Sequence, residues 1–467
     1  MVFSSLEFLT LFLPLVILLY FILPAKCRNG ILLLFSLVFY AWGEPVYILI
    51  MLFSILVNYL FGLGICKAEN RQKTKKVLLV ISVIVNLMML GVFKYSDFAV
   101  GNVNSIFQTE IALPGITLPI GISFFTFQAM SYVFDVYRKD AEAQKNILNF
   151  GLYISLFPQL IAGPIVRYST VAEEINNRKV SPELAAKGIK RFLTGLAKKV
   201  LLANNIGFLW SQISETQNVT AAAAWLGAIA FTFQIYFDFS GYSDMAIGLG
   251  YVFGFHFLEN FDYPYISKSI TEFWRRWHIS LGTWFREYVY IPLGGNRRGT
   301  ARQIRNILIV WLLTGLWHGA SWNFVFWGLY YGVLLMLEKF VLNRFLEKLP
   351  SVIRRCYTLL IVVFGWVIFA FDNTASLFSY LGGMFGANGP ADRTFVYDLT
   401  SNAVLLIILF VASTPVCKKI GEKFRSKSGK SAAVYAVFET VWYLLLFVLS
   451  LAYLVDSTYN PFIYFRF

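Results

Sequence analysis

The fold is decided by apolar runs that are long enough to cross a lipid bilayer. Residues 46–66 read VYILIMLFSILVNYLFGLGIC and carry no charged side chain. A helix of about 20 apolar residues spans the hydrocarbon core of a membrane. Comparable, nearly uncharged runs recur at 6–23, 77–93, 222–253 and 434–454. The sequence therefore predicts an all-α, polytopic membrane protein.

The composition supports the same fold class. Hydrophobic types make up 58% of the 467 residues and charged types only 14%, whereas soluble domains carry roughly 25% charged residues. The formal net charge of +14 does not point to nucleic acid, because basic residues gather in the cytoplasmic loops of membrane proteins. The four cysteines have no CxxC spacing, so neither a metal site nor a disulfide framework is indicated. We expect membrane lipid as the surroundings, no metal and no nucleic acid partner.

Clusters of Lys and Arg set the expected topology. Six clusters hold 37 of the 40 basic residues. They occupy residues 26–28, 67–76, 138–199, 268–305, 339–355 and 418–430. Placing all six on the cytoplasmic side gives about 11–12 spanning helices with both termini outside. We expect a single integral membrane domain over 1–467, with a motif-rich core at 150–340 and an aromatic tail at 460–467.

One apolar segment, residues 146–166, does not fit a simple crossing. A crossing there would move the basic residues of 167–199 to the outside. The segment also contains Pro158, Gly163 and Pro164. We expect a broken or re-entrant helix, which a membrane tolerates only where protein buries the backbone.

The chemically most informative stretch runs from residue 233 to 328, because it holds all three histidines of the chain. Ionisable groups at membrane depth are costly and usually face a cavity or a partner. His318 lies at the turn of an expected hairpin of two short helices, 304–317 and 321–337. It could act as a general base, since its unperturbed pKa of ~6.5 suits proton transfer near neutral pH. It could equally be a buried histidine that is hydrogen-bonded to a neighbouring helix.

The segment FWRRWHISL, residues 273–281, is strongly basic and aromatic. Arg275 and Arg276 could bind the phosphates of a cytoplasmic donor, because arginine pairs with phosphate in a bidentate manner. The alternative is an anchor at the membrane interface, where Trp277 would be typical. We interpret His256, a little earlier in the chain, as structural.

An acidic residue precedes this segment within an expected helix. Asp238 and Tyr242 are four residues apart and share a helix face, whereas Asp244 points elsewhere. The shared face could line a polar path, or it could pair with the arginines of the next segment. The pattern alone does not decide between these.

These residues resemble motifs of a known family, the membrane-bound O-acyltransferases (MBOAT). The likeness is strongest to the bacterial branch of alginate and peptidoglycan O-acetyltransferase membrane subunits, and more distant to the teichoic acid D-alanylation membrane protein. The matching stretches follow in the expected order: Met1–Ser5, Phe157–Tyr168, Phe233–Gly248, Glu272–Leu281, Tyr288–Arg297 and Leu316–Gly319. The resemblance implies acyl transfer, with His318 as the essential catalytic histidine and His278 as a second catalytic one. It also implies acetyl-CoA as the donor, which we expect Arg275, Arg276 and Trp277 to bind.

The resemblance further implies a bacterial plasma (inner) membrane location and an exported, esterase-like partner that places the acetyl group on a polysaccharide. The C-terminal residues 460–467, NPFIYFRF, resemble the aromatic tail of several relatives. We expect Tyr464 to be a catalytic residue that carries the acetyl group transiently. The alternative is that the tail is only an interfacial anchor, because aromatic side chains are favoured at the membrane surface.

The leading hypothesis is thus a membrane O-acetyltransferase that moves an acetyl group across the membrane to a cell-wall or other surface polysaccharide. The alternative is a polytopic transporter or flippase of a lipid-linked sugar or metabolite. Transporters often carry broken helices in matched positions of two repeats. The breaks near 158–164 and 318 form no obvious pair. A purely scaffolding subunit would have no need of the polar groups around His318.

Overall fold

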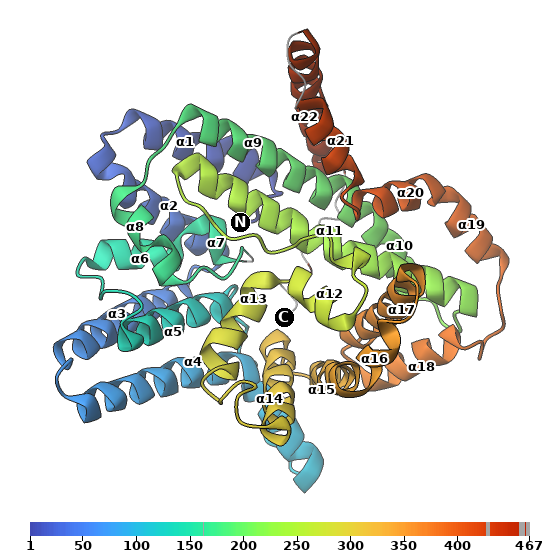
Figure 1. The fold of residues 1–467 in the computed structure, drawn as a ribbon, viewed down its shortest axis with the longest axis horizontal. Coiled ribbons are helices and arrows are strands. Elements are labelled where there is room, and N and C mark those ends of the chain that lie inside the picture. The colour runs from blue at the N-terminus through green and yellow to red at the C-terminus, as the bar shows by residue number, and fades with distance from the viewer. Residues whose placement is uncertain (162, 426–429, 457–462, 464–467) are drawn as a thin grey trace. The chain divides into compact units, whose positions relative to one another are not determined.

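The computed structural model describes residues 1–467 with the exception of 162, 426–429, 457–462 and 464–467. Every regular element in the described residues is a helix, and no strand occurs among them (Figure 1). The expected all-α fold is confirmed.

Six helices in the described part of the chain are long and apolar enough to cross a membrane. They are Ile48–Lys67 (α3), Gln72–Phe107 (α4), Ala221–Phe253 (α11), Trp322–Leu346 (α15 with its continuation), Ser351–Ala370 (α17) and Ala433–Asp456 (within α22). A seventh is added if the bent pair Arg393–Ser401 (α19) and Ala403–Ala412 (α20) is one span. The polytopic membrane fold is confirmed, although the number is below the 11–12 expected. Several expected crossings consist of helices that are short or interrupted, such as Phe8–Ile22.

The chain forms two compact units. Unit 1 comprises Met1–Phe192 and Ser243–Leu258, and unit 2 comprises Leu193–Tyr242 and Glu259–Phe467. The expectation of a single domain stays a prediction. Besides α3 and α4, the main helices of unit 1 are Leu13–Ile22 (α1), Arg28–Gly43 (α2), Ile122–Arg138 (α5), Ile147–Ser155 (α6), Phe157–Leu160 (α7) and Tyr168–Asn177 (α8).

Within unit 1, helix α3 packs against both α4 and α5. The side chains of Asn58 on α3 and Asn86 on α4 exchange hydrogen bonds of 3.1 and 2.8 Å. Asparagine pairs of this kind hold membrane helices together, because hydrocarbon offers no other partner for the amide.

The expected break in the segment 146–166 is confirmed. Helix α6 ends at Ser155, and the four-residue helix α7 begins at Phe157 with Pro158 in its first turn. Most of this segment is buried by protein. The Phe157 amide donates to the hydroxyl of Ser36 on α2 at 3.1 Å, which satisfies one backbone group that the break exposes.

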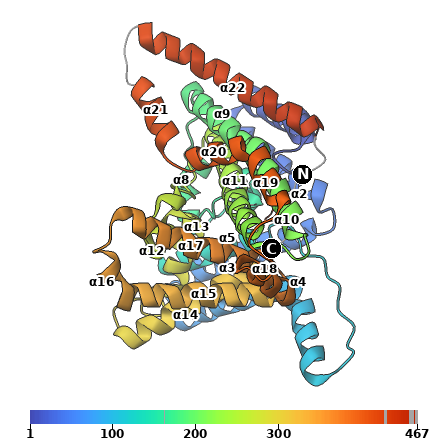
Figure 2. The same cartoon turned by 90° about the vertical axis from the view of Figure 1, so that its right-hand side faces the viewer.

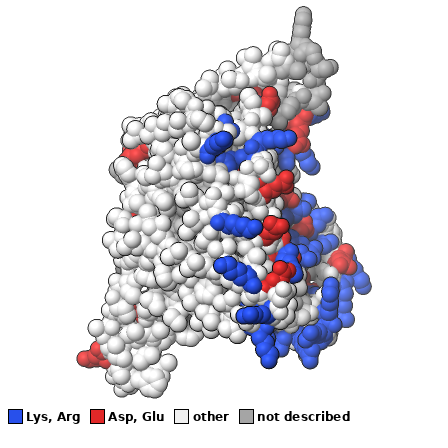
Figure 3. Space-filling model, turned by 90° about the vertical axis from the view of Figure 1, so that its left-hand side faces the viewer, with Lys and Arg blue, Asp and Glu red and all other residues white. Residues whose placement is uncertain are grey.

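The exposed basic side chains of unit 1 lie mainly at the ends of helices. They include Lys26, Lys67, Arg71, Lys73, Lys76, Arg138 and Lys139. Figure 3 shows Lys and Arg side chains together with some acidic ones, next to broad areas of surface that carry no charge. This distribution is the one that basic cytoplasmic loops produce in membrane proteins.

Unit 2 carries the hairpin that contains His318. Its further main helices are Asn204–Ser214 (α10), Ile270–Arg276 (α12), Ile279–Phe285 (α13), Thr300–His318 (α14), Trp322–Leu337 (α15) and Thr374–Met384 (α18). Helices α14 and α15 run alongside each other (Figure 2). Glycines allow this close approach: a Cβ on Gly315 would lie 2.2 Å from the Phe324 carbonyl oxygen, and one on Gly328 would lie 2.4 Å from that of Trp311. The expected hairpin is confirmed.

Candidate functional site

His318 is the last residue of α14, and only 7% of it is exposed. Its imidazole meets Trp327 edge to face at 5.1 Å between ring centroids, and Phe369 in the same manner at 5.2 Å. Trp327 belongs to α15 and Phe369 to α17. Three helices of unit 2 therefore fix the position of the imidazole.

The imidazole lines a small pocket that lies wholly within unit 2. Its lining residues are Ile235, Asp238, Phe239, Trp277, His318, Trp327, Trp366, Phe369 and Ile463. The walls are aromatic, and His318 and Asp238 are the ionisable groups among these nine residues. A mostly apolar pocket with a few convergent polar groups is the usual form of a small-molecule site.

Asp238 forms a buried ion pair with Lys199. The carboxylate Oδ1 lies 2.7 Å from Lys199 Nζ, and the two side chains are 3% and 2% exposed. Lys199 also donates to the amide oxygen of Asn204 at 2.7 Å. The other carboxylate oxygen, Oδ2, accepts the main-chain N–H of Ile463 at 2.9 Å.

The acidic residues of α11 thus pair with basic residues that precede them in the chain. These contacts therefore differ from the alternative in which the acidic residues pair with the arginines of the following segment. Asp244 accepts from both Nε and Nη2 of Arg191, at 3.1 and 2.9 Å, within unit 1. Asp238 instead pairs with Lys199 and lines the pocket, so the first of the two interpretations, a polar lining, describes it better.

His278 lies between α12 and α13, outside the pocket lining. It adopts a left-handed backbone conformation with φ of 45°, and its Nδ1 lies 3.1 Å from Oδ1 of Asn260. The ring packs edge to face against Phe239 at 4.6 Å, and Phe239 is itself a wall of the pocket. Burial lowers the pKa of His278 to about 3. His278 is therefore a neutral side chain behind the wall at physiological pH.

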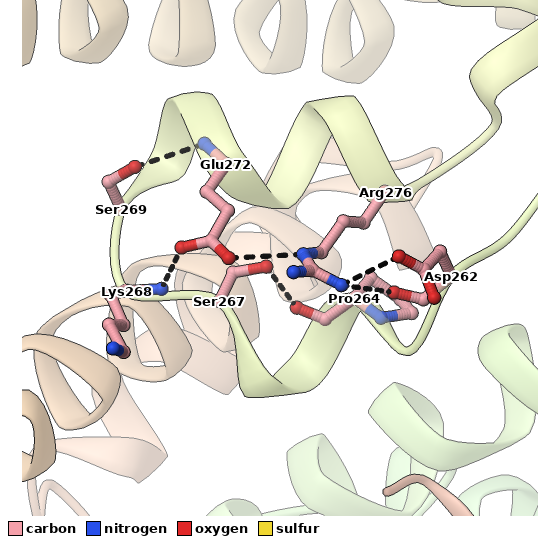
Figure 4. A network of polar contacts seen from close by, with 7 residues as sticks. All are labelled: Asp262, Pro264, Ser267, Lys268, Ser269, Glu272 and Arg276. Atoms are coloured by element: carbon pink, nitrogen blue, oxygen red, sulfur yellow. Dashed lines mark hydrogen bonds and ion pairs between the residues drawn. The ribbon is translucent and has the colours of Figure 1, made fainter. Parts of the chain in front are cut away.

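Arg276 is the centre of a polar network that ties α12 to the loop before it (Figure 4). Its Nε donates to Glu272 at 3.1 Å, and its Nη1 donates to the Asp262 carboxylate at 2.7 Å. Glu272 also accepts the Lys268 amide at 2.9 Å, and Ser269 caps the helix by accepting the Glu272 amide. The Arg276 guanidinium is thus already shared between two carboxylates.

The three residues expected to bind the donor occupy different surroundings. Arg275 is exposed, Arg276 lies in the network just described, and Trp277 is buried in the pocket wall. The Trp277 ring packs on Trp366 at 4.7 Å. Their role in donor binding stays a prediction. His256, expected to be structural, is exposed and pairs with Glu174 at 2.6 Å.

Two residues that support the site were missed by sequence reasoning. Glu338, which is 2% exposed, follows α15 and accepts the amides of Ile270 and Thr271 at 2.7 and 2.9 Å, so it caps α12. Asn260 accepts from the Ser280 hydroxyl at 2.9 Å and holds His278. The available signal for Glu338 was a single acid at the end of an apolar helix, which usually marks a buried partner.

Tyr464 lies outside the described residues, so its expected role stays a prediction. Its neighbour Ile463 is described and lines the pocket beside His318. In the described part of the chain, no group of three or more His, Cys, Asp or Glu could hold a metal ion.

Comparison with known proteins identifies similar chains. The sequence model of the MBOAT, membrane-bound O-acyltransferase family, matches residues 36–381. A probable alginate O-acetylase AlgI of Pseudomonas putida is 39% identical over 485 residues, which cover all of both chains. A peptidoglycan O-acetyltransferase of Helicobacter pylori is 34% identical over 89% of this chain and 86% of that protein. A teichoic acid D-alanyltransferase of Bacillus subtilis is 30% identical over 54% of this chain and 67% of its own.

Proposed function

Because this chain belongs to the membrane-bound O-acyltransferase family, and is thus a membrane acyltransferase, we propose that it O-acetylates a polysaccharide outside the cell. The acetyl group comes from acetyl-CoA on the cytoplasmic side. The enzyme is a multi-pass protein of the bacterial plasma (inner) membrane. The observation that carries the proposal is the buried His318 in an apolar pocket, in a chain similar over its whole length to an alginate O-acetylase.

In this proposal His318 acts as a general base. It takes the proton from an acceptor hydroxyl, whose oxygen attacks the carbonyl carbon of the acetyl thioester. The C–S bond breaks, and the proton passes to the departing thiolate to give free CoA. General base catalysis of this kind typically contributes about 10²–10⁴-fold.

The aromatic walls support this chemistry by limiting the access of water. Trp327, Phe369 and Trp366 surround the pocket, so few polar groups are left to hold water next to the thioester. A dry site protects a reactive acyl group from hydrolysis and strengthens the electrostatic interactions within it.

For the donor, we assign the phosphates of acetyl-CoA to Arg275, whose side chain is exposed. Trp277 contributes to the pocket wall. Arg276 was expected to share this role, but phosphate binding there would compete with Glu272 and Asp262. We therefore propose that Arg276 shapes the donor site by holding α12.

We also propose that Tyr464 receives the acetyl group and passes it to an exported, esterase-like partner. The presence of Ile463 in the pocket lining supports the proposal. A phenol with a pKa of ~10 needs a base to become a nucleophile, and His318 would supply it. The acetylated phenol is then a good donor, because phenolate leaves more readily than an alkoxide.

The experiment that separates an acyltransferase from a transporter uses the purified full-length chain in detergent with radiolabelled acetyl-CoA. We expect release of free CoA thiol in an amount that matches the label transferred to protein or water. A transporter would leave the thioester intact, and unchanged acetyl-CoA after prolonged incubation would contradict the proposed reaction. His256→Ala is the matched control, since this exposed histidine lies in unit 1 and outside the pocket.

A further inference from the structure

Asp238, which lines the pocket, belongs to a buried ion pair that the proposed chemistry does not use. Asp238 and Lys199 are 3% and 2% exposed, and their charged atoms lie 2.7 Å apart. Burying two charges is expensive, and well-packed apolar side chains of similar size would often stabilise a protein better. The pair therefore calls for a role that apolar side chains could not fill.

The two oxygens of the Asp238 carboxylate have different partners. Oδ1 faces Lys199 Nζ, which is itself held by Asn204 at 2.7 Å. Oδ2 accepts the main-chain N–H of Ile463 at 2.9 Å, a contact that spans 225 positions of the sequence. Lys199 thus fixes the carboxylate so that its second oxygen points at the main chain of Ile463.

The contact with residue 463 combines a polar and an apolar component. The main-chain N–H is bound by a charged acceptor, and hydrogen bonds to charged groups are stronger than those between neutral groups. The Ile463 side chain lies in the same pocket as Trp277 and His318. An apolar wall and one directed acceptor are together sufficient to seat a chain segment.

We propose that Asp238 is a positioning residue that seats Ile463 in the His318 pocket by binding its main-chain N–H. Lys199 orients this carboxylate through the ion pair. The seating itself is independent of any reaction. Its consequence for transfer, that residue 463 is held in the pocket of the catalytic base, rests on the function proposed above.

The first test measures how accessible residue 463 is. The four cysteines, Cys27, Cys66, Cys356 and Cys417, are exposed and are replaced by serine in the full-length protein. Ile463→Cys is then introduced into two proteins, one that keeps Asp238 and Lys199 and one that carries Asp238→Leu plus Lys199→Met. The rate at which a maleimide labels residue 463 is measured in both. The double change removes both charges together, so no lone buried charge remains.

We expect labelling to be at least about tenfold faster in the double variant, because a hydrogen bond to a charged group shifts an equilibrium by that factor or more. The matched control is Asp244→Leu plus Arg191→Met, which removes the ion pair of unit 1. It should leave the rate at residue 463 unchanged. Equal labelling rates with and without the Asp238–Lys199 pair would overturn the proposal, whether or not the chain transfers acetyl groups.

The second test removes the donor and keeps the carboxylate. Ile463→Pro lacks the main-chain N–H, whereas Ile463→Ala keeps it and loses most of the apolar contact. We expect acetyl transfer to be at least about tenfold lower in the proline variant than in the alanine variant, because both lose apolar contact but only proline loses the N–H. Adding Ile463→Pro to the double change should lower transfer no further, since the acceptor is already gone. Full activity of the proline variant would contradict the seating role.

Discussion

Gly328 of α15 lies so close to Trp311 of α14 that a Cβ on the glycine would stand 2.4 Å from the tryptophan carbonyl oxygen. The same helix carries Trp327, whose ring meets His318 at the end of α14. The distance between the two helices therefore determines where the imidazole lies. Any side chain at residue 328 would push the two arms of the hairpin apart.

Gly328→Ala should accordingly impair activity without preventing membrane insertion. The added methyl group meets backbone, which cannot move aside as a flexible side chain can. Overpacking of this kind costs about 1–3 kcal/mol. We expect a lower thermal midpoint and a loss of acetyl transfer. The control is Gly91→Ala in α4, since a Cβ there has nothing within 4 Å. A Gly328→Ala protein as active and stable as the control would show that the hairpin spacing does not matter.

The two arginines of α12 should behave differently when each is replaced by alanine. Arg275 is exposed, so Arg275→Ala should raise the KM for acetyl-CoA and leave the thermal midpoint unchanged. Arg276→Ala removes bonds to Asp262 and Glu272, which should lower the midpoint by the equivalent of about 0.5–1 kcal/mol, because both carboxylates are accessible to water. Titration with acetyl-CoA and thermal unfolding of both variants check this. Unchanged donor affinity in Arg275→Ala would return that residue to the role of a membrane anchor.

His278 should make the folded protein sensitive to acid. Its pKa falls from the usual 6.5 to about 3 on burial, so the unfolded chain binds a proton that the folded chain refuses. Stability is then fully present above pH 6.5 and is lost as the pH falls toward 3. At pH 5 the loss amounts to about 2 kcal/mol. Thermal unfolding at pH 7 and pH 5 should show a smaller acid effect in His278→Gln than in the parent. An equal effect in both would mean that His278 does not titrate in this way.

Tyr464→Phe keeps the aromatic character of the tail and removes only the hydroxyl. If residue 464 carries the acetyl group, the variant should still consume acetyl-CoA slowly but should no longer acetylate the surface polysaccharide. The acetyl content of the polymer, measured in cells that express each variant, checks this. Acetylation at the parental rate would show that the tail is an anchor. Tyr459→Phe, which also removes one hydroxyl, is the comparison.

The sequence was most informative where a single segment contains the whole signal. The charge-free run at 46–66 predicted α3, and the prolines and glycine of 158–164 predicted the break between α6 and α7. His318 was placed correctly at a hairpin turn because its flanking glycines are local. Such features depend on the residues of one segment, so periodicity and composition suffice to find them.

Partners that come from distant segments could not be predicted in the same way. Lys199 was grouped with the cytoplasmic basic residues, yet it is buried against Asp238. Arg276 was interpreted as a phosphate ligand, but Asp262 and Glu272 already bind it. Helical spacing shows which residues share a face, but it does not show which face of another helix lies opposite.

The central claim, that His318 is the catalytic base, is tested most directly by replacing it with alanine. The full-length His318→Ala protein and the His256→Ala control are purified, matched in amount and thermal midpoint, and supplied with radiolabelled acetyl-CoA. We predict that the control transfers acetyl groups at the parental rate and that His318→Ala loses about 10²–10⁴-fold of it. Retention of more than about a tenth of the parental rate by His318→Ala, far above that range, would contradict the assignment.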